Sequence, residues 1–289
     1  MIPINPIPQH DNLLISSIYL WLDNYILTKG QGYTNTNILF YRINEIFNGI
    51  QSYASPFNQF ISDSSVTGAY IGTGVYINNI LCGTGENGLY HIDYNNGRIY
   101  TTGLNSNATI SGQFSIKYFN LKLTNEPDEK ILTDTSYTLR PKTNIMLTGL
   151  NNNQNNYPII FIKDNGSFNM PLTFGGLENT VNNIRLIALA DSLYSINALN
   201  SILRDTCKRN IPLLSIDDMP FNLMGDFKNS NYNYTDLTQP IINQGNLAYI
   251  NEVYVAKYNQ SYVDLRNINS KIYWSIIDME IHTHRYPRS

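Results

Sequence analysis

The sequence predicts an α+β fold with an N-terminal helix, an antiparallel β region after it, and a C-terminal mixed sheet with one main helix. Three observations predict it: an apolar helical repeat near the N-terminus, short alternating runs after it, and a second half that mixes buried strands with one main helix. The expected divisions are an arm and helix over 1–30, the antiparallel β region over 31–125, and an α/β core over 126–289.

The first helix follows a proline-punctuated arm. Asp11 stands where an N-cap is expected, and Leu14, Ile18 and Tyr25 recur after it at helical spacing. Gly30 and Gly32 then end the pattern, so the sequence predicts a helix that spans Leu13 to Leu27.

The β region contains one clear hairpin and one strand whose pattern changes. In LYHIDYNNGRIYTTG the runs on either side alternate, and Asn96-Gly97 predicts a type I′ turn between them. In ATISGQFSIKYFNLKLT the apolar residues change parity, which predicts a bulge near Tyr118. The acidic segment NEPDEK then marks the boundary of this region.

The second half opens with a nearly continuous apolar strand from Pro158 to Lys163, a pattern typical of a strand covered on both faces. VNNIRLIALADS is a second such strand. A helix is expected next, with Leu193, Ile196, Leu199, Leu203 and Cys207 on one face and Lys208 and Arg209 in its last turn. NSNYNYTDLTQP has the composition of a loop, and YINEVYVAKYN and KIYWSIIDMEIHTHRY are the closing strands.

The composition is dominated by uncharged polar residues. Only 14% of the 289 residues are charged, whereas Asn, Ile and Tyr number 41, 37 and 22. These three residues share AT-rich codons with Lys, yet the chain has only 10 Lys, so the composition indicates that positive surface is disfavoured. A net charge of −3 argues against binding to nucleic acid or to anionic membranes.

The cysteines and the N-terminus indicate a cytoplasmic setting. Cys82 and Cys207 have no CxxC partner, so neither a disulfide framework nor a zinc site is expected. The N-terminus lacks the basic and apolar regions of a signal peptide, and no run reaches 18 apolar residues.

Two motifs could carry chemistry, and for both we favour a structural interpretation. Gly83 to Gly88 matches G-x-G-x-x-G, but a hairpin rather than a helix follows it, so we interpret it as a turn and not as a phosphate site. Asp128-Glu129 and Asp217-Asp218 are adjacent residues whose side chains would diverge, so we expect solvated loop charge.

The last strand offers the one metal-ligand pattern. Asp278, Glu280, His282 and His284 would share one face and could hold a divalent cation. Alternate strand residues are about 7 Å apart, which is wide for one ion, so we favour a polar face that meets solvent or a subunit. We therefore expect no enzymatic activity, with no catalytic, cofactor-binding or metal-binding residues.

The order of elements in the second half resembles the tail-terminator and tail-completion proteins of tailed bacteriophages. The resemblance rests on the strand YPIIFIK, the loop Phe174-Gly175-Gly176, the strand NNIRLIALAD with Arg185, the helix SINALNSILRD after Asp191, and a closing strand with Asp-x-Glu. It covers residues 157–210, and more weakly 11–28 and 248–285. The resemblance implies that the helix from Leu13 to Leu27 packs on the C-terminal sheet and that the β region over 31–125 is an insertion between them. SYASPFNQFISDSSVTGA and the hairpin also look like segments of virion neck proteins.

This resemblance implies a ring-forming subunit, expected as a hexamer, that joins the tail tube to the connector at the head–tail junction. Its partners would be copies of itself and neighbouring neck, tail-tube or sheath proteins, in a virion assembled in the host cytoplasm. A baseplate or tail-fibre component remains an alternative, because the Asn- and Tyr-rich β region suits it equally. A carbohydrate-binding β-module is a further alternative, since exposed Tyr and Asn suit sugar stacking and hydrogen bonding.

Overall fold

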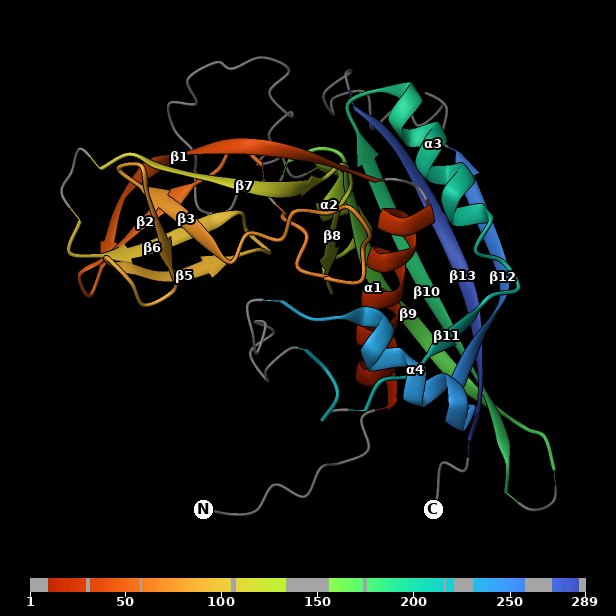
Figure 1. The fold of residues 1–289 in the computed structure, drawn as a ribbon. Helices are drawn as coiled ribbons and strands as arrows, with labels where there is room; N and C mark the ends of the chain where they lie inside the picture. The colour runs from red at the N-terminus through yellow and green to blue at the C-terminus, as the bar shows by residue number, and fades with distance from the viewer. Residues whose placement is uncertain are drawn as a thin grey trace.

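The protein contains two β-sheets with a helix between them, as seen in a computed structural model (Figure 1). The structure describes residues 10–29, 32–57, 59–104, 108–133, 156–173, 176–215, 217–220, 231–257 and 272–285; the side chains of 44–47, Thr133 and Lys257 are outside this description. The sheets have seven and six strands in the described part of the chain, so the α+β class predicted from the sequence is confirmed at this coarse level.

The first helix, α1 (His10–Lys29), is buried on almost every side. Leu14, Ile18 and Leu22 are at most 1% exposed, because the helix lies on the six-stranded sheet and also meets the inserted β region. The predicted helix is confirmed, but the prediction that Asp11 is its N-cap is wrong. Asp11 lies inside the first turn, where its carboxylate accepts a hydrogen bond from Asn182 Nδ2 at 3.1 Å.

The seven-stranded sheet is antiparallel throughout and has the order β4-β3-β7-β1-β2-β6-β5. Its strands are β1 (Tyr33–Phe47), β2 (Ile50–Ala54), β3 (Gly74–Ile77), β4 (Ile80–Gly83), β5 (Leu89–Asp93), β6 (Arg98–Thr102) and β7 (Ile110–Lys117). Two hairpins close through pairs of residues with positive φ, Asn48-Gly49 and Asn78-Asn79. Positive φ at both central positions is the mark of a type I′ turn.

The predicted hairpin between β5 and β6 is confirmed, but its turn is of another type. The loop has four residues, Tyr94 to Gly97, and of these only Gly97 has a positive φ. The Asp93 carboxylate instead accepts hydrogen bonds from the backbone N–H groups of Asn95 and Asn96, both at 3.0 Å. These hydrogen bonds form an Asx turn, and the loop therefore does not have the type I′ geometry.

The change of parity after Tyr118 is a change of sheet, so the predicted bulge is wrong. β7 ends at Lys117 within the seven-stranded sheet, and β8 (Asn120–Leu123) runs parallel to β9 (Ile159–Pro171) in the six-stranded sheet. Ile116 and Leu121 are therefore buried in two different cores. A sheet change and a bulge produce the same switch of apolar residues along one strand, because side chains alternate with period two.

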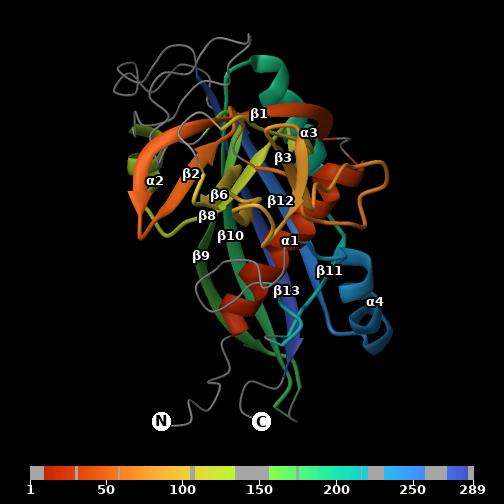
Figure 2. The same cartoon turned by 60° about the vertical axis from the view of Figure 1, so that its left-hand side comes forward.

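The six-stranded sheet has the order β11-β12-β13-β10-β9-β8. Its long strands are β9 (Ile159–Pro171), β10 (Glu178–Ala190), β12 (Leu247–Lys257) and β13 (Tyr273–Arg285), and β11 (Asn210–Pro212) lies at one edge. Figure 2 shows the long strands side by side, with α1 lying across them. All four predicted strands are confirmed, and residues 159–162 are buried on both faces as expected.

Three further helices complete the described chain: α2 (Asp128–Thr133), α3 (Leu193–Arg204) and α4 (Tyr234–Gln244). The predicted helix over α3 is confirmed, but it ends before Cys207, Lys208 and Arg209, and Leu193 is 54% exposed. α4 contradicts the prediction of a loop. Its N-cap Asn233 accepts a hydrogen bond from the Asp236 N–H at 3.1 Å, and the residues that suggested a loop are those of a capped helix start.

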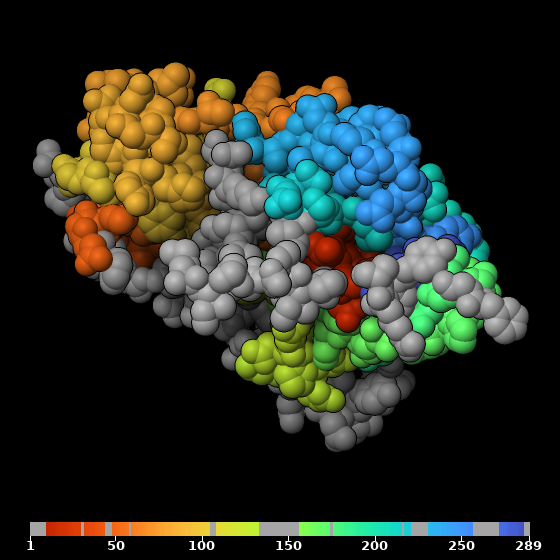
Figure 3. Space-filling model, turned by 90° about the horizontal axis from the view of Figure 1, so that it is seen from below, coloured from red at the N-terminus to blue at the C-terminus, as the bar shows by residue number. Residues whose placement is uncertain are grey.

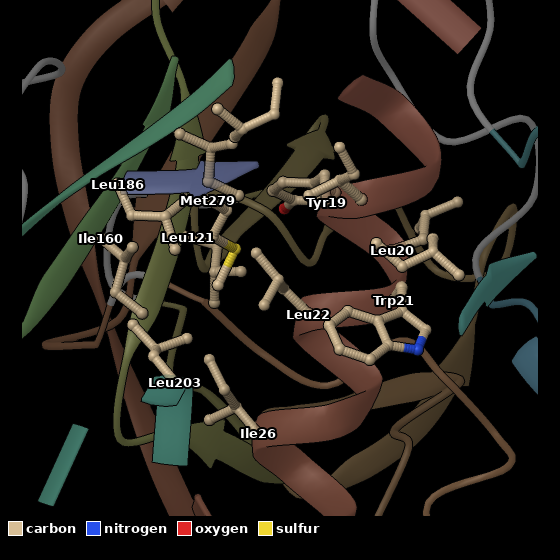
Figure 4. Close-up of a cluster of buried hydrophobic side chains, with 14 of the residues drawn as sticks. Tyr19, Leu20, Trp21, Leu22, Ile26, Leu121, Ile160, Leu186, Leu203 and Met279 are labelled. Carbon is tan, nitrogen blue, oxygen red and sulfur yellow. The ribbon is translucent and has the colours of Figure 1, made fainter. Parts of the chain in front are cut away.

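The main core lies between α1, α3 and one face of the six-stranded sheet (Figure 4). Leu22 and Ile26 of α1 lie beside Leu121, Leu186, Leu203 and Met279 in this core. The opposite face of the sheet has a smaller cluster of six buried side chains around α2: Ile131, Tyr157, Ile159, Phe161, Ile187 and Leu189. Farther along the strands, the same face carries charged and polar side chains.

Candidate functional site

Four charged side chains form a row across the face of the six-stranded sheet that lies opposite α1. Arg185 of β10 stands directly between Lys163 of β9 and Asp278 of β13 in the strand register. Its guanidinium donates to both carboxylate oxygens of Asp278, at 2.7 and 3.1 Å. It also donates to Asp128 at 2.8 Å, and Lys163 donates to the other oxygen of Asp128 at 2.8 Å. Cations and anions thus alternate along the row.

Asp128 reaches this row because it begins α2, and it is not the solvated loop charge that we expected. Its side chain is 20% exposed. Burial opposes its charge, but the hydrogen bonds from Lys163 and Arg185 outweigh burial and hold its pKa below the ordinary value. The bond to Asp278 likewise raises the pKa of Arg185. By contrast, Asp217 and Asp218 are exposed and lie in a turn, as predicted.

Glu280 and His282 form a second polar group farther along β13. His282 Nε2 lies 2.7 Å from Glu280 Oε1, and Asn251 Nδ2 donates to the same oxygen at 2.7 Å. The bonds from Asn251 and then His282 lower the pKa of Glu280. Asn179 Nδ2 lies 3.1 Å from His282 Nδ1, so both ring nitrogens have a partner.

The proposed metal-ligand pattern is therefore divided between separate partners. Side chains alternate on β13 as predicted, with Asp278, Glu280 and His282 on the face opposite the main core. Asp278 is paired with Arg185, Glu280 with His282, and His284 is exposed. Within the described ranges, no group of three or more His, Cys, Asp or Glu side chains is placed to hold a metal ion.

The G-x-G-x-x-G segment connects β4 to β5 as a turn. Gly85 and Gly88 have φ of +90° and +84°, which explains two of the glycines. The N–H of Gly83 donates to the Glu86 carboxylate at 2.8 Å. Because a carboxylate of the chain occupies this N–H and a strand follows, the segment does not have the geometry of a phosphate loop.

A buried ion pair between α1 and β7 was not found from the sequence. Lys117 Nζ lies 2.7 Å from Asp23 Oδ1, and the two side chains are 5% and 3% exposed. Burial raises the pKa of Asp23, and Lys117 opposes this rise. The available signal was a single aspartate inside the apolar run LWLDNYIL.

Asp63 lies in the same region and is fully buried. It accepts hydrogen bonds from Asn24 Nδ2 at 2.8 Å, from the Ser65 N–H at 2.9 Å and from the Tyr234 N–H at 3.0 Å. These bonds connect α1, the loop after β2 and the start of α4. We interpret Asp63 and the ion pair as a joint that fixes the inserted β region to the six-stranded sheet.

Among the described residues, the six-stranded sheet is open along parts of both edges. β8 pairs only with residues 159–162 of β9, and β11 pairs only with residues 247–249 of β12. Beyond these segments, no strand in the described part of the chain pairs with the outer side of β9 or β12. Unpaired strand edges present rows of backbone N–H and C=O groups that can bind another strand.

No protein-family model matches this chain, and no curated protein matches it either. None of the helices in the described ranges is long and apolar enough to cross a membrane.

Proposed function

We propose that this chain is a non-enzymatic structural subunit of a phage virion, and that copies of it form a ring at the head–tail junction between tail tube and connector. The observation that carries self-assembly is the six-stranded sheet, both of whose edges are partly open among the described residues. A subunit with one open edge on each side can bind a neighbour at both, and such head-to-tail contacts form a ring when the rotation between neighbours closes and a filament when it does not.

The arrangement of elements supports the phage assignment. The resemblance implies an N-terminal helix that packs on the same sheet as the C-terminal strands, and α1 occupies such a position. The inserted antiparallel sheet lies outside that resemblance, and buried contacts through Asp23, Lys117 and Asp63 join it to α1 and α4. Its role in the ring would be contact with a neighbouring neck, tail-tube or sheath protein.

The charges of the chain support a ring through which DNA passes without being held. Lys163 and Arg185 are both engaged with carboxylates, and Lys117 is buried. Affinity for nucleic acid depends on cations that neutralise phosphates, and these three cations are already neutralised within the chain. The net charge of −3 adds a general repulsion.

Imaging of the purified full-length protein by negative stain, together with its mass from light scattering, tests the proposal. We expect closed rings of identical subunits, with six as the number that the resemblance implies. Trimeric rods would favour the baseplate or tail-fibre alternative instead. A protein that stays monomeric at the concentrations used for imaging would refute self-assembly, and specific binding on a glycan array would then favour the carbohydrate-binding module.

A further inference from the structure

The two open edges belong to strands that run in opposite directions. Between β9 and β12 lie β10 and β13, and each neighbouring pair among these four strands is antiparallel. Three antiparallel steps reverse the direction, so β9 and β12 point oppositely in one molecule. When two copies stand in the same orientation, as they do in a ring, β9 of one copy and β12 of the next are therefore antiparallel.

The open part of β9 carries large apolar side chains. β9 and β10 form a hairpin that extends beyond the body of the molecule (Figure 1), and it lies at the rim in the view from below (Figure 3). Phe168 and Met170 on β9 are 50% and 40% exposed, and Leu172 just beyond the strand is 53% exposed. Phe168 pairs with Val181 of β10, which in turn pairs with His282 of β13. The Phe168 side chain therefore lies on the face of the sheet opposite α1, which carries the row of charged side chains and is called the polar-row face below.

The open part of β12 begins after the contacts of β11. The Lys208 N–H donates to the Ile250 carbonyl and the Ile250 N–H to the Arg209 carbonyl, both at 2.9 Å, and Lys208 Nζ donates to the Asn251 carbonyl. Farther along, Tyr254 is 69% exposed. Tyr254 pairs with Asp278, so it too lies on the polar-row face.

We infer that the outer edge of β9 in one copy pairs antiparallel with the outer edge of β12 in the next copy, with Phe168 beside Tyr254. The inference rests on the proposed self-assembly and specifies its contact. The occupant of each edge is a second copy because the two edges complement each other: their directions are opposite, their faces match, and each carries an exposed aromatic ring. Aromatic pairs across neighbouring strands stabilise sheets.

The positions of the two open segments agree with a closed ring. The open half of β9 pairs with residues of β10 that in turn pair with the end of β13, near Arg285. The open half of β12 pairs directly with the beginning of β13, near Tyr273. Neighbouring copies are therefore displaced along the strand direction. Strands that are staggered in this way tilt relative to the axis of a closed sheet, as they do in barrels.

Disulfide cross-linking of full-length protein tests the contact. Cys207→Ser removes the partly exposed native thiol, while Cys82 is buried and stays. In this background the double variant Phe168→Cys/Tyr254→Cys should give a ladder of covalent multimers under mild oxidation, which disappears with reductant. Each single cysteine variant should give no ladder. Circular dichroism of each variant checks the fold.

The outcomes separate this contact from self-assembly itself. If the parent protein is oligomeric but the double variant gives no ladder, the β9–β12 contact is wrong and the proposed function stands. A covalent dimer from Phe168→Cys alone would overturn the contact in favour of β9 against β9. As a second measurement, Phe168→Lys should lower the oligomer mass, whereas the matched change Tyr194→Lys at an 85% exposed position on α3 should not. A Phe168→Lys protein with unchanged mass would overturn the contact.

Discussion

Removing Lys117 should weaken the fold strongly, because its partner Asp23 would then be buried without a countercharge. The two side chains are 5% and 3% exposed, and Lys117 Nζ lies 2.7 Å from Asp23 Oδ1. Breaking a buried ion pair from one side typically destabilises a protein by about 3–5 kcal/mol. We therefore expect Lys117→Met to lower the free energy of unfolding by about 3–5 kcal/mol at neutral pH.

The loss should depend on pH with a definite sign. Burial already raises the pKa of Asp23 above its ordinary 3.8, and the variant also lacks the opposing effect of Lys117. An acid with a raised pKa binds its proton more tightly in the folded state, so the free energy of unfolding falls as pH rises through the window above 3.8. The deficit of Lys117→Met relative to the parent should therefore be largest near pH 8 and smaller near pH 5.

Urea unfolding followed by tryptophan fluorescence measures this effect, since Trp21 lies on α1 two residues before Asp23. Lys130→Met is the matched control: its ion pair with Glu126 is 60% and 50% exposed, and such pairs contribute at most about 1 kcal/mol. The double variant Asp23→Leu/Lys117→Met should regain most of the loss. A single variant within 1 kcal/mol of the parent, or a deficit that grows toward acid, would refute the reasoning.

Three further predictions concern the polar row, a turn and a helix cap. Arg185→Gln leaves the carboxylates of Asp128 and Asp278 without their shared cation, so the free energy of unfolding from urea titrations should fall by about 1–3 kcal/mol. Because the folded state lowers the pKa of Asp128, the stability that the ionised Asp128 contributes in the parent should vanish as pH falls below 3.8. Gly49→Ala should lower stability by about 1–2 kcal/mol in the same titration, since φ is +77° with open space around a Cβ, and an unchanged midpoint would contradict a type I′ turn. Asn233→Ala should cost about 0.5–2 kcal/mol and increase amide exchange in the first turn of α4; unaltered exchange would contradict the cap.

The elements that could be predicted from the sequence are those whose pattern is set by local burial. Residues 159–162 of β9 and 186–190 of β10 are buried between the two cores, so their apolar runs are continuous and unambiguous. α4 could not be predicted because few of its residues are buried and Pro240 stands inside it. Its cap and its buried Ile241 favour a helix only when the six-stranded sheet is present to pack against.

The separation of β7 from β8 could not be predicted for a different reason. A local pattern reports which side chains are buried, but not which core buries them. Ile116 and Leu121 both look like core residues of one bent strand, and they lie in different cores because β8 pairs with β9, some 40 positions later. Only the long-range pairing distinguishes the two cases.

The same limit applies to the charged residues. Asp128 looked solvated because its neighbours in sequence are polar, and its two cation partners lie 35 and 57 positions away. The alternation of Asp278, Glu280 and His282 on one face could be predicted, since it is local to β13. Their division into separate pairs depends on Arg185 and Asn251, which only the sheet register places opposite them.

The register also changes the meaning of the low lysine count. Lys117 is neutralised inside the joint, Lys163 by Asp128, and Lys208 caps the Asn251 carbonyl while its ammonium lies 5.7 Å from the centre of the Tyr249 ring. The positive charge that reaches solvent is thus smaller than 10 Lys would give. Meanwhile the large apolar and aromatic side chains of β9 and β12 remain exposed beside unpaired strand edges. In the part of the chain that the structure describes, these features support the proposed contact between strand edges of two copies more than a contact with phosphate.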